Sequence, residues 1–408
     1  MDSVVGQQDK RYAGATSAAV TANWLAEFRA RHNRPMRVLH GPVNVGNQPW
    51  VLSRAERRLG IESELVVNSD TWLNYRADRV LQRRDERHAT NLARRISFGI
   101  SAPFKYDILH FYFGRSYLYF EDATGRRSLL APFLAADLRI ARRLGKKVFM
   151  TLQGCDVRSA ANTNKRNVWT ACAEGHCPVY GACLSTHDAQ RRRMIERLLP
   201  LCDRVFYLNP DLGHELPASA TFLPYASCEI GELAVALPRA SGRPRIVHAP
   251  SNAGIKGTPM ILEALQHLRG RYDFDLILVE NKPHAEALAM YRDADLAIDQ
   301  VLGGWYGGFA VEMMALGKPV ACMIRDEDLG FVPPAMRAEL PLRRVHPERL
   351  VADLAAILDA QAQWPHWGRD ARRFVERWHD PDAVARAMVA CYLDPASRFA
   401  STEAGVPV

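Results

Sequence analysis

A glycine-rich segment in the second half of the chain combines the residue types that a phosphate-binding turn uses. It reads GGWYGGFAVEMMALGKPV from Gly303 to Val320 and follows an apolar run, ADLAIDQ, with the pattern of a strand. A helix is expected to begin near Gly308. The first N–H groups of a helix have no acceptor within it and lie at the positive end of its dipole, so this turn suits a phosphate. Glu312, about one turn into the helix, can accept hydrogen bonds from ribose hydroxyls.

A second segment adds a cation to this chemistry. In HAPSNAGIKGTPMILEALQHL, residues 248–268, Thr258 followed by Pro259 is typical of a helix N-cap and first helical residue. Lys256 is therefore expected just before a helix amino end, where an ammonium beside exposed backbone amides suits a diphosphate. The alternative is a lysine on an ordinary loop.

Four of the eight cysteines, Cys155, Cys172, Cys177 and Cys183, lie close together in the first half of the chain. With the histidines nearby they could supply four ligands to Zn or to an iron–sulfur cluster. The spacing C-x4-C-x5-C of the last three is not a recognised CxxC pair. Ordinary reduced thiols in a structured insertion, or redox-active disulfides, are the alternatives.

The glycine-rich turn, the lysine and the cysteines must be positioned by strands, and the chain contains two series of predicted strands. β-rich runs with intervening helical periodicity occupy residues 37–40, 64–67, 107–112, 147–154, 204–209 and 221–225. A second series has strands at 245–250, 274–280, 294–300 and 319–324, and helices at about 259–268, 284–292 and 309–316. Strands alternating with helices predict parallel sheets covered by helices on both faces, with ligands bound at the carboxyl ends of the strands. The fold class expected is α/β, with two Rossmann-like doubly wound domains facing a cleft and C-terminal helices.

The expected domain organisation follows from the change of pattern along the chain. Its parts are a peripheral extension at 1–35, a first domain at 36–230 with a Cys-rich insertion at about 155–187, a linker at 231–245, a second domain at 246–375, and a C-terminal helix and tail at 376–408. A break at Pro381 would let the last helix return to the first domain.

Residues 245–325 resemble the donor domain of the retaining glycosyltransferases with the GT-B fold, family 4 in particular. In that family a lysine before the first donor-domain helix contacts the diphosphate of a nucleotide sugar, and Lys256 falls on its position. A later E-G-F-G segment, with a second glutamate four residues on, binds phosphate, sugar and ribose. Here Gly307 falls on the second glycine and Glu312 on the second glutamate. Gly304 stands where the first glutamate is expected.

The resemblance also implies candidates outside this motif. Asp299 is a substitute for the missing carboxylate, or else caps the turn after its strand. In the first domain, Gly46 matches the glycine loop that approaches the donor phosphate, and TLQGCDVR places Gln153 and Asp156 where the family has a His and an Asp. The donor-binding set is Gly46, Asn252, Lys256, Asp299, Trp305, Tyr306, Gly307, Gly308 and Glu312, and the catalytic set is Asp156, Lys256 and Glu312.

The resemblance implies a retaining hexosyltransferase. Its donor would be a UDP- or GDP-linked sugar and its acceptor a glycan or a lipid-linked glycan, in the synthesis of cell-surface polysaccharide or glycoconjugate. No cofactor is required for catalysis in that family. Two alternatives stay open, namely a sugar-nucleotide 2-epimerase on the same fold and a non-catalytic nucleotide-sugar-binding partner.

Charge bears on the acceptor. Residues 1–230 contain 33 Lys and Arg against 22 Asp and Glu, while the remainder contains 20 against 23. This basic surplus favours an anionic acceptor and peripheral contact with an anionic membrane surface, although solvated arginine-rich helix faces would explain it too. No nucleic-acid-recognition module is recognisable. The chain shows neither a bilayer-spanning apolar run nor a secretion signal, so a cytoplasmic protein is expected, with contact at the inner face of the membrane.

Overall fold

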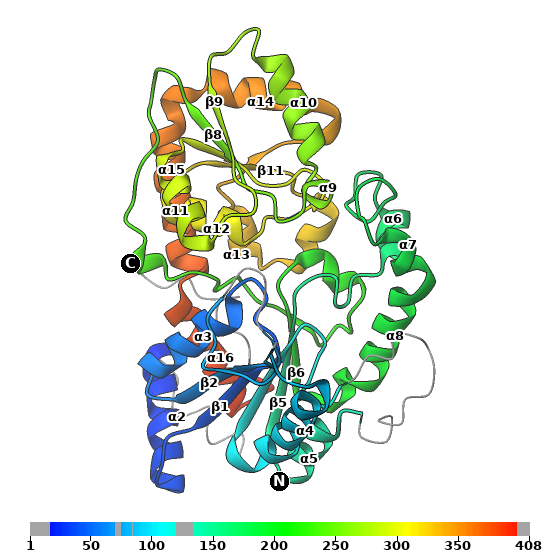
Figure 1. Cartoon of the computed structure of the whole chain (residues 1–408). Helices are drawn as coiled ribbons and strands as arrows, with labels where there is room; N and C mark the ends of the chain where they lie inside the picture. The colour runs from blue at the N-terminus through cyan, green and yellow to red at the C-terminus, as the bar shows by residue number, and fades with distance from the viewer. Residues whose placement is uncertain (1–16, 70–74, 84, 120–133, 398–408) are drawn as a thin grey trace.

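The structure is a computed structural model that describes residues 17–69, 75–83, 85–119 and 134–397. It has two α/β domains, one above the other in Figure 1. The chain passes from the first domain to the second and returns to the first at its C-terminal end. Residues 1–16 of the expected extension at 1–35 lie outside the described residues, and its remaining part contains the helix α2 (Ser17–His32).

The first domain is built on a seven-stranded parallel sheet in the order β3-β2-β1-β4-β5-β6-β7. Its strands are β1 (Arg37–Gly41), β2 (Glu62–Val67), β3 (Arg79–Val80), β4 (Ile108–Tyr112), β5 (Lys147–Leu152), β6 (Arg204–Tyr207) and β7 (Thr221–Phe222). The order reverses between β1 and β4, and this is the place where doubly wound sheets bind ligands beyond the carboxyl ends of their strands. Every residue of β4 is buried, as expected for a parallel strand covered on both faces.

The second domain has a five-stranded parallel sheet in the order β12-β11-β10-β8-β9. Its strands are β8 (Arg245–His248), β9 (Asp275–Leu278), β10 (Leu296–Ile298), β11 (Val320–Cys322) and β12 (Arg343–Arg344). The two short edge strands β3 and β12 were not predicted, whereas the equally short β7 was, because it lies within the apolar run at 221–225.

Helices cover both sheets. Those of the first domain are α3 (Gln48–Arg58), α4 (His88–Lys105), α5 (Ala136–Arg143), α6 (Ala160–Arg166), α7 (Tyr180–Ala182), the π-helix η2 (Cys183–His187) and α8 (Asp188–Arg197). Those that follow β8 are α9 (Ala253–Lys256), α10 (Thr258–Leu268), α11 (His284–Asp293), α12 (Gly308–Ala315), α13 (Pro334–Ala338) and α14 (Leu350–Asp359). Among the described residues, none of the helices is long and apolar enough to cross a bilayer.

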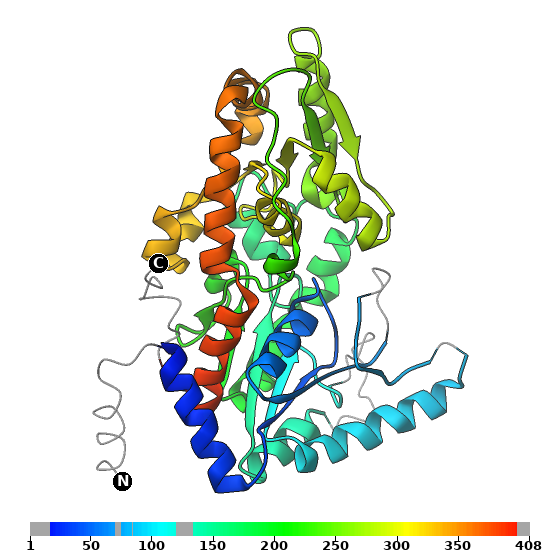
Figure 2. The same cartoon turned by 90° about the vertical axis from the view of Figure 1, so that its left-hand side faces the viewer.

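The last two helices connect the domains. Helix α15 (Trp364–Trp378) belongs to the second domain. Helix α16 (Pro381–Leu393) returns to the first domain, where it lies beside α2 and α3 (Figure 2). Asp380 caps α16 by accepting a hydrogen bond from the Ala383 amide, so the chain restarts a helix directly after the break at Pro381. The buried face of α16 packs into a core shared with β1, β4, β5 and β6.

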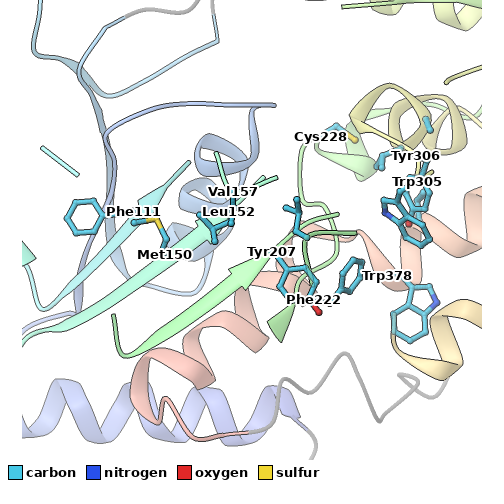
Figure 3. Packing of buried hydrophobic residues seen from close by; sticks show 14 of the residues in the cluster. Phe111, Met150, Leu152, Val157, Tyr207, Phe222, Cys228, Trp305, Tyr306 and Trp378 are labelled. Carbon is cyan, nitrogen blue, oxygen red and sulfur yellow. The ribbon is translucent and has the colours of Figure 1, made fainter. Parts of the chain in front are cut away.

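Another apolar core is continuous from the first sheet into the second domain. Figure 3 shows Phe111 and Met150 at one end of it and Trp305 and Tyr306 at the other. Phe222 of β7 meets Trp305 edge-to-face, with ring centroids 6.0 Å apart. Because apolar side chains fill the contact between the domains, their relative placement is held by packing as well as by the chain connections.

Candidate active site

Lys256 is held at the end of a short helical turn rather than in a loop. Asn252 caps this turn, α9, through a hydrogen bond of 3.0 Å from the Ile255 amide to its Oδ1 atom. Gly257 then takes a left-handed conformation with φ 75°, where a Cβ would press on Val301, and α10 begins at Thr258. The predicted N-cap role of Thr258 is therefore wrong, because Gly257 occupies that position. The Thr258 hydroxyl instead lies 2.8 Å from Nε2 of the buried His248.

The Lys256 ammonium pairs with Asp299 at the end of β10. Its Nζ atom lies 2.6 Å from Asp299 Oδ1, and the Asp299 side chain is fully buried. The second carboxylate oxygen, Oδ2, accepts a hydrogen bond of 2.7 Å from the Gly307 amide. Asp299 thus both caps the strand-end turn and holds the lysine. The Gly307 amide is occupied, so the amides open to a ligand begin with Gly308.

Helix α12 starts at Gly308, as predicted from its glycine-rich turn. A Cβ on Gly307 would lie 3.3 Å from Lys256 Nζ, so the ammonium sits directly beside the helix amino end. Gly308 in turn faces Ser227 of the segment that enters the linker, at 3.6 Å from the position of a Cβ to the hydroxyl. An ammonium and a helix amino end therefore converge on one place, which favours a bound anion.

Glu312 lies one turn further along α12, and its side chain is 11% exposed. Its Oε1 atom is 2.6 Å from Nε2 of His284, the first residue of α11. The hydrogen bond with Glu312 raises the pKa of His284, against the lowering effect of burial. Tyr75, from the first domain, meets the His284 ring edge-on at 6.0 Å. Sequence reasoning missed His284, and its only signal was a position directly after Pro283 at the start of a helix.

The first-domain candidates lie at the carboxyl ends of its strands. Gly46 is left-handed with φ 61°, and a Cβ there would meet no atom within 4 Å. Asp156 is 9% exposed, and its carboxylate accepts hydrogen bonds from the amides of Gln153 (2.9 Å) and Gly154 (2.7 Å), so it caps the turn after β5. It also lines a cavity of about 230 Å³ together with Arg191.

The four clustered cysteines do not form a metal site in this structure. All eight cysteines are free thiols. Within residues 17–69, 75–83, 85–119 and 134–397, no group of three or more His, Cys, Asp or Glu side chains is arranged to hold a metal ion. Cys155, Cys172, Cys177 and Cys183 form no such group here, and metal binding by them stays a prediction. Burial raises the pKa of Cys172 to about 11, so this sulfur stays protonated at neutral pH.

Comparisons with known proteins bear on the fold. No protein-family model matches the chain, and no curated protein matches it. Among solved structures, sucrose-phosphate synthase from Thermosynechococcus elongatus is similar with a TM-score of 0.54 at 13% sequence identity, over 89% of this chain and 100% of that chain. This chain has the GT-B fold. The predicted fold class is confirmed.

Two further GT-B structures are similar at lower scores. WaaG, a glycosyltransferase involved in lipopolysaccharide biosynthesis, has a TM-score of 0.49 at 12% identity, over 86% of this chain and 98% of its own. The glycosyltransferase SnogD from Streptomyces nogalater has a TM-score of 0.40 at 16% identity, over 88% of this chain and 99% of its own.

Within this GT-B chain, the side chains of Trp305 and Tyr306 are buried and do not reach a surface where a ligand could bind. Trp305 is 1% exposed and Tyr306 is fully buried in the core between the domains. The Tyr306 hydroxyl lies 2.9 Å from Nε2 of His379. Their expected side-chain contact with a donor is therefore corrected, because Trp305 packs against Phe222 of β7 and Tyr306 against Tyr225, Phe374 and His379.

The structure also explains why a glycine stands at position 304. Gly304 is left-handed with φ 76°, and a Cβ would clash with the guanidinium of Arg325. Arg325 is 6% exposed and donates hydrogen bonds to the carbonyl oxygens of Leu302 (3.1 Å) and Trp169 (2.9 Å). Trp169 belongs to the Cys-rich insertion, which therefore contacts the second domain where the GT-B motif of family 4 would have its first glutamate.

We expect Gly304→Ala to lower the free energy of unfolding by more than the cost of placing an alanine in a left-handed conformation. Gly145→Ala is the matched control, because Gly145 has φ 67° and open space around a Cβ. The control should cost about 1 to 2 kcal/mol, the usual penalty for a side chain in this conformation. Gly304→Ala should cost more, since Arg325 must also move. Urea unfolding measures both, and equal losses would show that Arg325 does not restrict position 304.

Proposed function

We propose that this protein is a retaining glycosyltransferase of the hexosyltransferase type. It transfers a sugar from a UDP- or GDP-linked donor to a glycan or lipid-linked acceptor, in the synthesis of cell-surface polysaccharide or glycoconjugate. The observation that carries the proposal is the convergence of the Lys256 ammonium and the amino end of α12 at the carboxyl ends of the second sheet. The fold that this chain shares with sucrose-phosphate synthase supports it.

The chemistry follows from where positive charge is held. When the bond between sugar and diphosphate breaks, negative charge develops on the leaving phosphate oxygen. A fixed ammonium at Lys256 and the Gly308 amide would stabilise that charge without reorganising, because Asp299 and the glycine turn already hold them. Glu312, oriented by His284, would bind the ribose hydroxyls. No covalent nucleophile on the protein is needed.

Two unpartnered acceptors in the first domain suit the hydroxyls of a sugar. Within the part of the chain that the structure describes, the buried atoms Asn44 Oδ1 and Gln153 Oε1 have no hydrogen-bond donor. Gln153 is tied to the glycine loop, since its Nε2 atom donates to the Val45 carbonyl at 3.2 Å. A buried polar atom without a partner costs about 1 to 3 kcal/mol, and a bound hydroxyl would remove that cost.

The pairing of His284 with Glu312 predicts a pH-dependent contribution to stability. Because the folded-state pKa of His284 is raised above its ordinary value of 6.5, this contribution is full below pH 6.5 and is lost as the pH rises through the raised pKa. We expect the Tm difference between wild type and His284→Ala to be larger near about pH 6 than near about pH 9. His284→Gln, which can donate a hydrogen bond without titrating, should stay closer to wild type than His284→Ala at both pH values, and its Tm difference from wild type should also fall as the pH rises. A constant difference for His284→Ala would contradict the pairing.

For the acceptor, we propose an anionic group and contact with an anionic membrane surface. The basic surplus lies in the first domain, and the cavity of about 230 Å³ there is lined by Arg115, His187 and Arg191 among others. Charges in water are screened within about 10 Å at 0.1 M salt. The acceptor KM should therefore rise with salt more than the donor KM, and liposomes containing an anionic lipid should retain the protein at low salt only. A neutral acceptor used equally at both salt levels, without liposome retention, would contradict this.

Product analysis with a labelled nucleotide sugar tests the proposed reaction. A transferase releases the nucleotide and forms a new glycoside with the anomeric configuration of the donor. A sugar-nucleotide 2-epimerase returns an altered sugar still linked to its nucleotide, and a non-catalytic binding partner returns the donor unchanged. A glycoside with the inverted anomeric configuration would still identify a transferase but would contradict the retaining mechanism.

A further inference from the structure

Ser227 has a buried hydroxyl that no described protein group satisfies. The residue is 4% exposed, and its Oγ atom has no hydrogen-bond partner among the residues that the structure describes. Leaving such a group unpaired costs about 1 to 3 kcal/mol, so a folded protein normally avoids it unless a ligand supplies the partner. The serine stands after β7, between Tyr225 and the linker, and no sequence motif marks it.

The backbone at Ser227 is held firmly by the loop that follows β1. The amide of Ala226 donates to Oε1 of Gln48 at 2.5 Å, and Nδ2 of Asn47 donates to the Ser227 carbonyl at 3.2 Å. Both partners follow Gly46 directly and begin α3. The first domain therefore fixes where the hydroxyl points, and neither of these contacts uses the hydroxyl itself.

The hydroxyl points at the amino end of α12 in the second domain. It lies 3.6 Å from the position that a Cβ on Gly308 would take, and any larger residue at 308 would close this space. Lys256 Nζ lies 3.3 Å, and Asp299 Oδ2 3.7 Å, from the position that a Cβ on the neighbouring Gly307 would take. A hydroxyl, a helix amino end and an ammonium all offer hydrogen atoms to one small volume, and a phosphate has enough acceptor oxygens for all of them.

We propose that the Ser227 hydroxyl donates a hydrogen bond to a phosphate oxygen of the bound nucleoside diphosphate. The inference rests on the proposed function and adds a residue from outside the donor domain. Because the first domain holds Ser227 while the second domain carries α12, the phosphate would be bound from both domains at once. Ser227 is a direct ligand of the leaving group, and it can reach the phosphate only while the two domains are placed relative to one another as they are here.

The test compares Ser227→Ala with Ser53→Ala. Ser53 is also buried, but its hydroxyl donates to the Trp50 carbonyl at 2.8 Å and lies within α3. Titration calorimetry with UDP, GDP and inorganic pyrophosphate should show about tenfold weaker binding by Ser227→Ala, which is the effect of about 1.4 kcal/mol. Ser53→Ala should bind as wild type does. Thermal unfolding should show the opposite order, because only Ser53→Ala loses a hydrogen bond within the protein.

The outcomes separate this inference from the proposed function. Equal binding of UDP or GDP by wild type and Ser227→Ala overturns the role of Ser227 and leaves the donor site standing. Binding of pyrophosphate alone, weakened in Ser227→Ala, supports the role of Ser227 and overturns the nucleotide donor. Absence of binding by wild type overturns both. Ser227→Cys provides a second variant of nearly unchanged size, and it should weaken binding as well, since a thiol is a poor donor.

Discussion

Lys256→Ala is expected to lower both the stability of the protein and its affinity for a nucleotide sugar. The variant leaves the Asp299 carboxylate fully buried without its counter-ion. Removing one partner of a buried ion pair costs about 3 to 5 kcal/mol of folding free energy. Losing a charge-assisted hydrogen bond to a phosphate should weaken donor binding by about 1.5 to 3 kcal/mol, or roughly 10- to 150-fold in Kd.

The double variant Lys256→Ala with Asp299→Asn separates these two effects. An asparagine at 299 is neutral and can still accept the hydrogen bond from the Gly307 amide. The double variant should therefore regain most of the stability but none of the donor affinity. Lys147→Ala is the control, because Lys147 pairs with Asp203 at 3.6 Å on the exposed side of the first domain. Urea unfolding and calorimetric titration give the two quantities, and recovery of donor affinity in the double variant would reject Lys256 as a phosphate ligand.

Glu56→Ala is the second change for which we expect a large effect. The Glu56 side chain, on α3, is fully buried, and its carboxylate accepts hydrogen bonds from His40 Nε2 (2.8 Å), Ser63 Oγ (2.7 Å) and the Tyr392 hydroxyl (2.9 Å). Tyr392 belongs to α16, and its hydroxyl also lies 2.7 Å from Nδ1 of His110. Truncation leaves several buried donors without an acceptor, so we expect a loss of about 3 to 5 kcal/mol.

Tyr392→Phe should show a smaller part of the same loss. It removes one hydroxyl and leaves the packing of α16 intact, so about 1 to 3 kcal/mol is expected. Glu286→Ala serves as the control, since Glu286 is 51% exposed and pairs with Lys282 on the surface. Urea unfolding followed by tryptophan fluorescence measures all three. If Glu56→Ala were as stable as Glu286→Ala, the buried network would not be what attaches the C-terminal helix to the first domain.

Local patterns in the sequence determined the elements and the main features of the fold. Largely apolar runs such as those that became β4 and β5, separated by helical periodicity, predict a parallel sheet, because a strand buried on both faces is mostly apolar. The glycine-rich turn before α12 predicted the start of this helix correctly. The position where a helix begins depends mainly on residues close by in the sequence, so a local pattern can mark it. Lys256 was expected before the amino end of the helix that follows it, and the tertiary structure also brings it beside the amino end of α12.

Contacts between residues far apart in the chain were decided by the tertiary structure alone. Asp299 reaches Lys256 across 43 positions, and Ser227 is held by Asn47 across 180. Such pairs leave no periodic signal, because each depends on how the two sheets and the linker are placed and not on the neighbours of either residue. The burial of Trp305 and the closeness of Gly304 to Arg325 have the same origin. Types and spacing therefore indicated which groups could bind a phosphate, whereas folding of the second domain brought Lys256 to the start of α12 and contact between the domains placed Ser227 beside them.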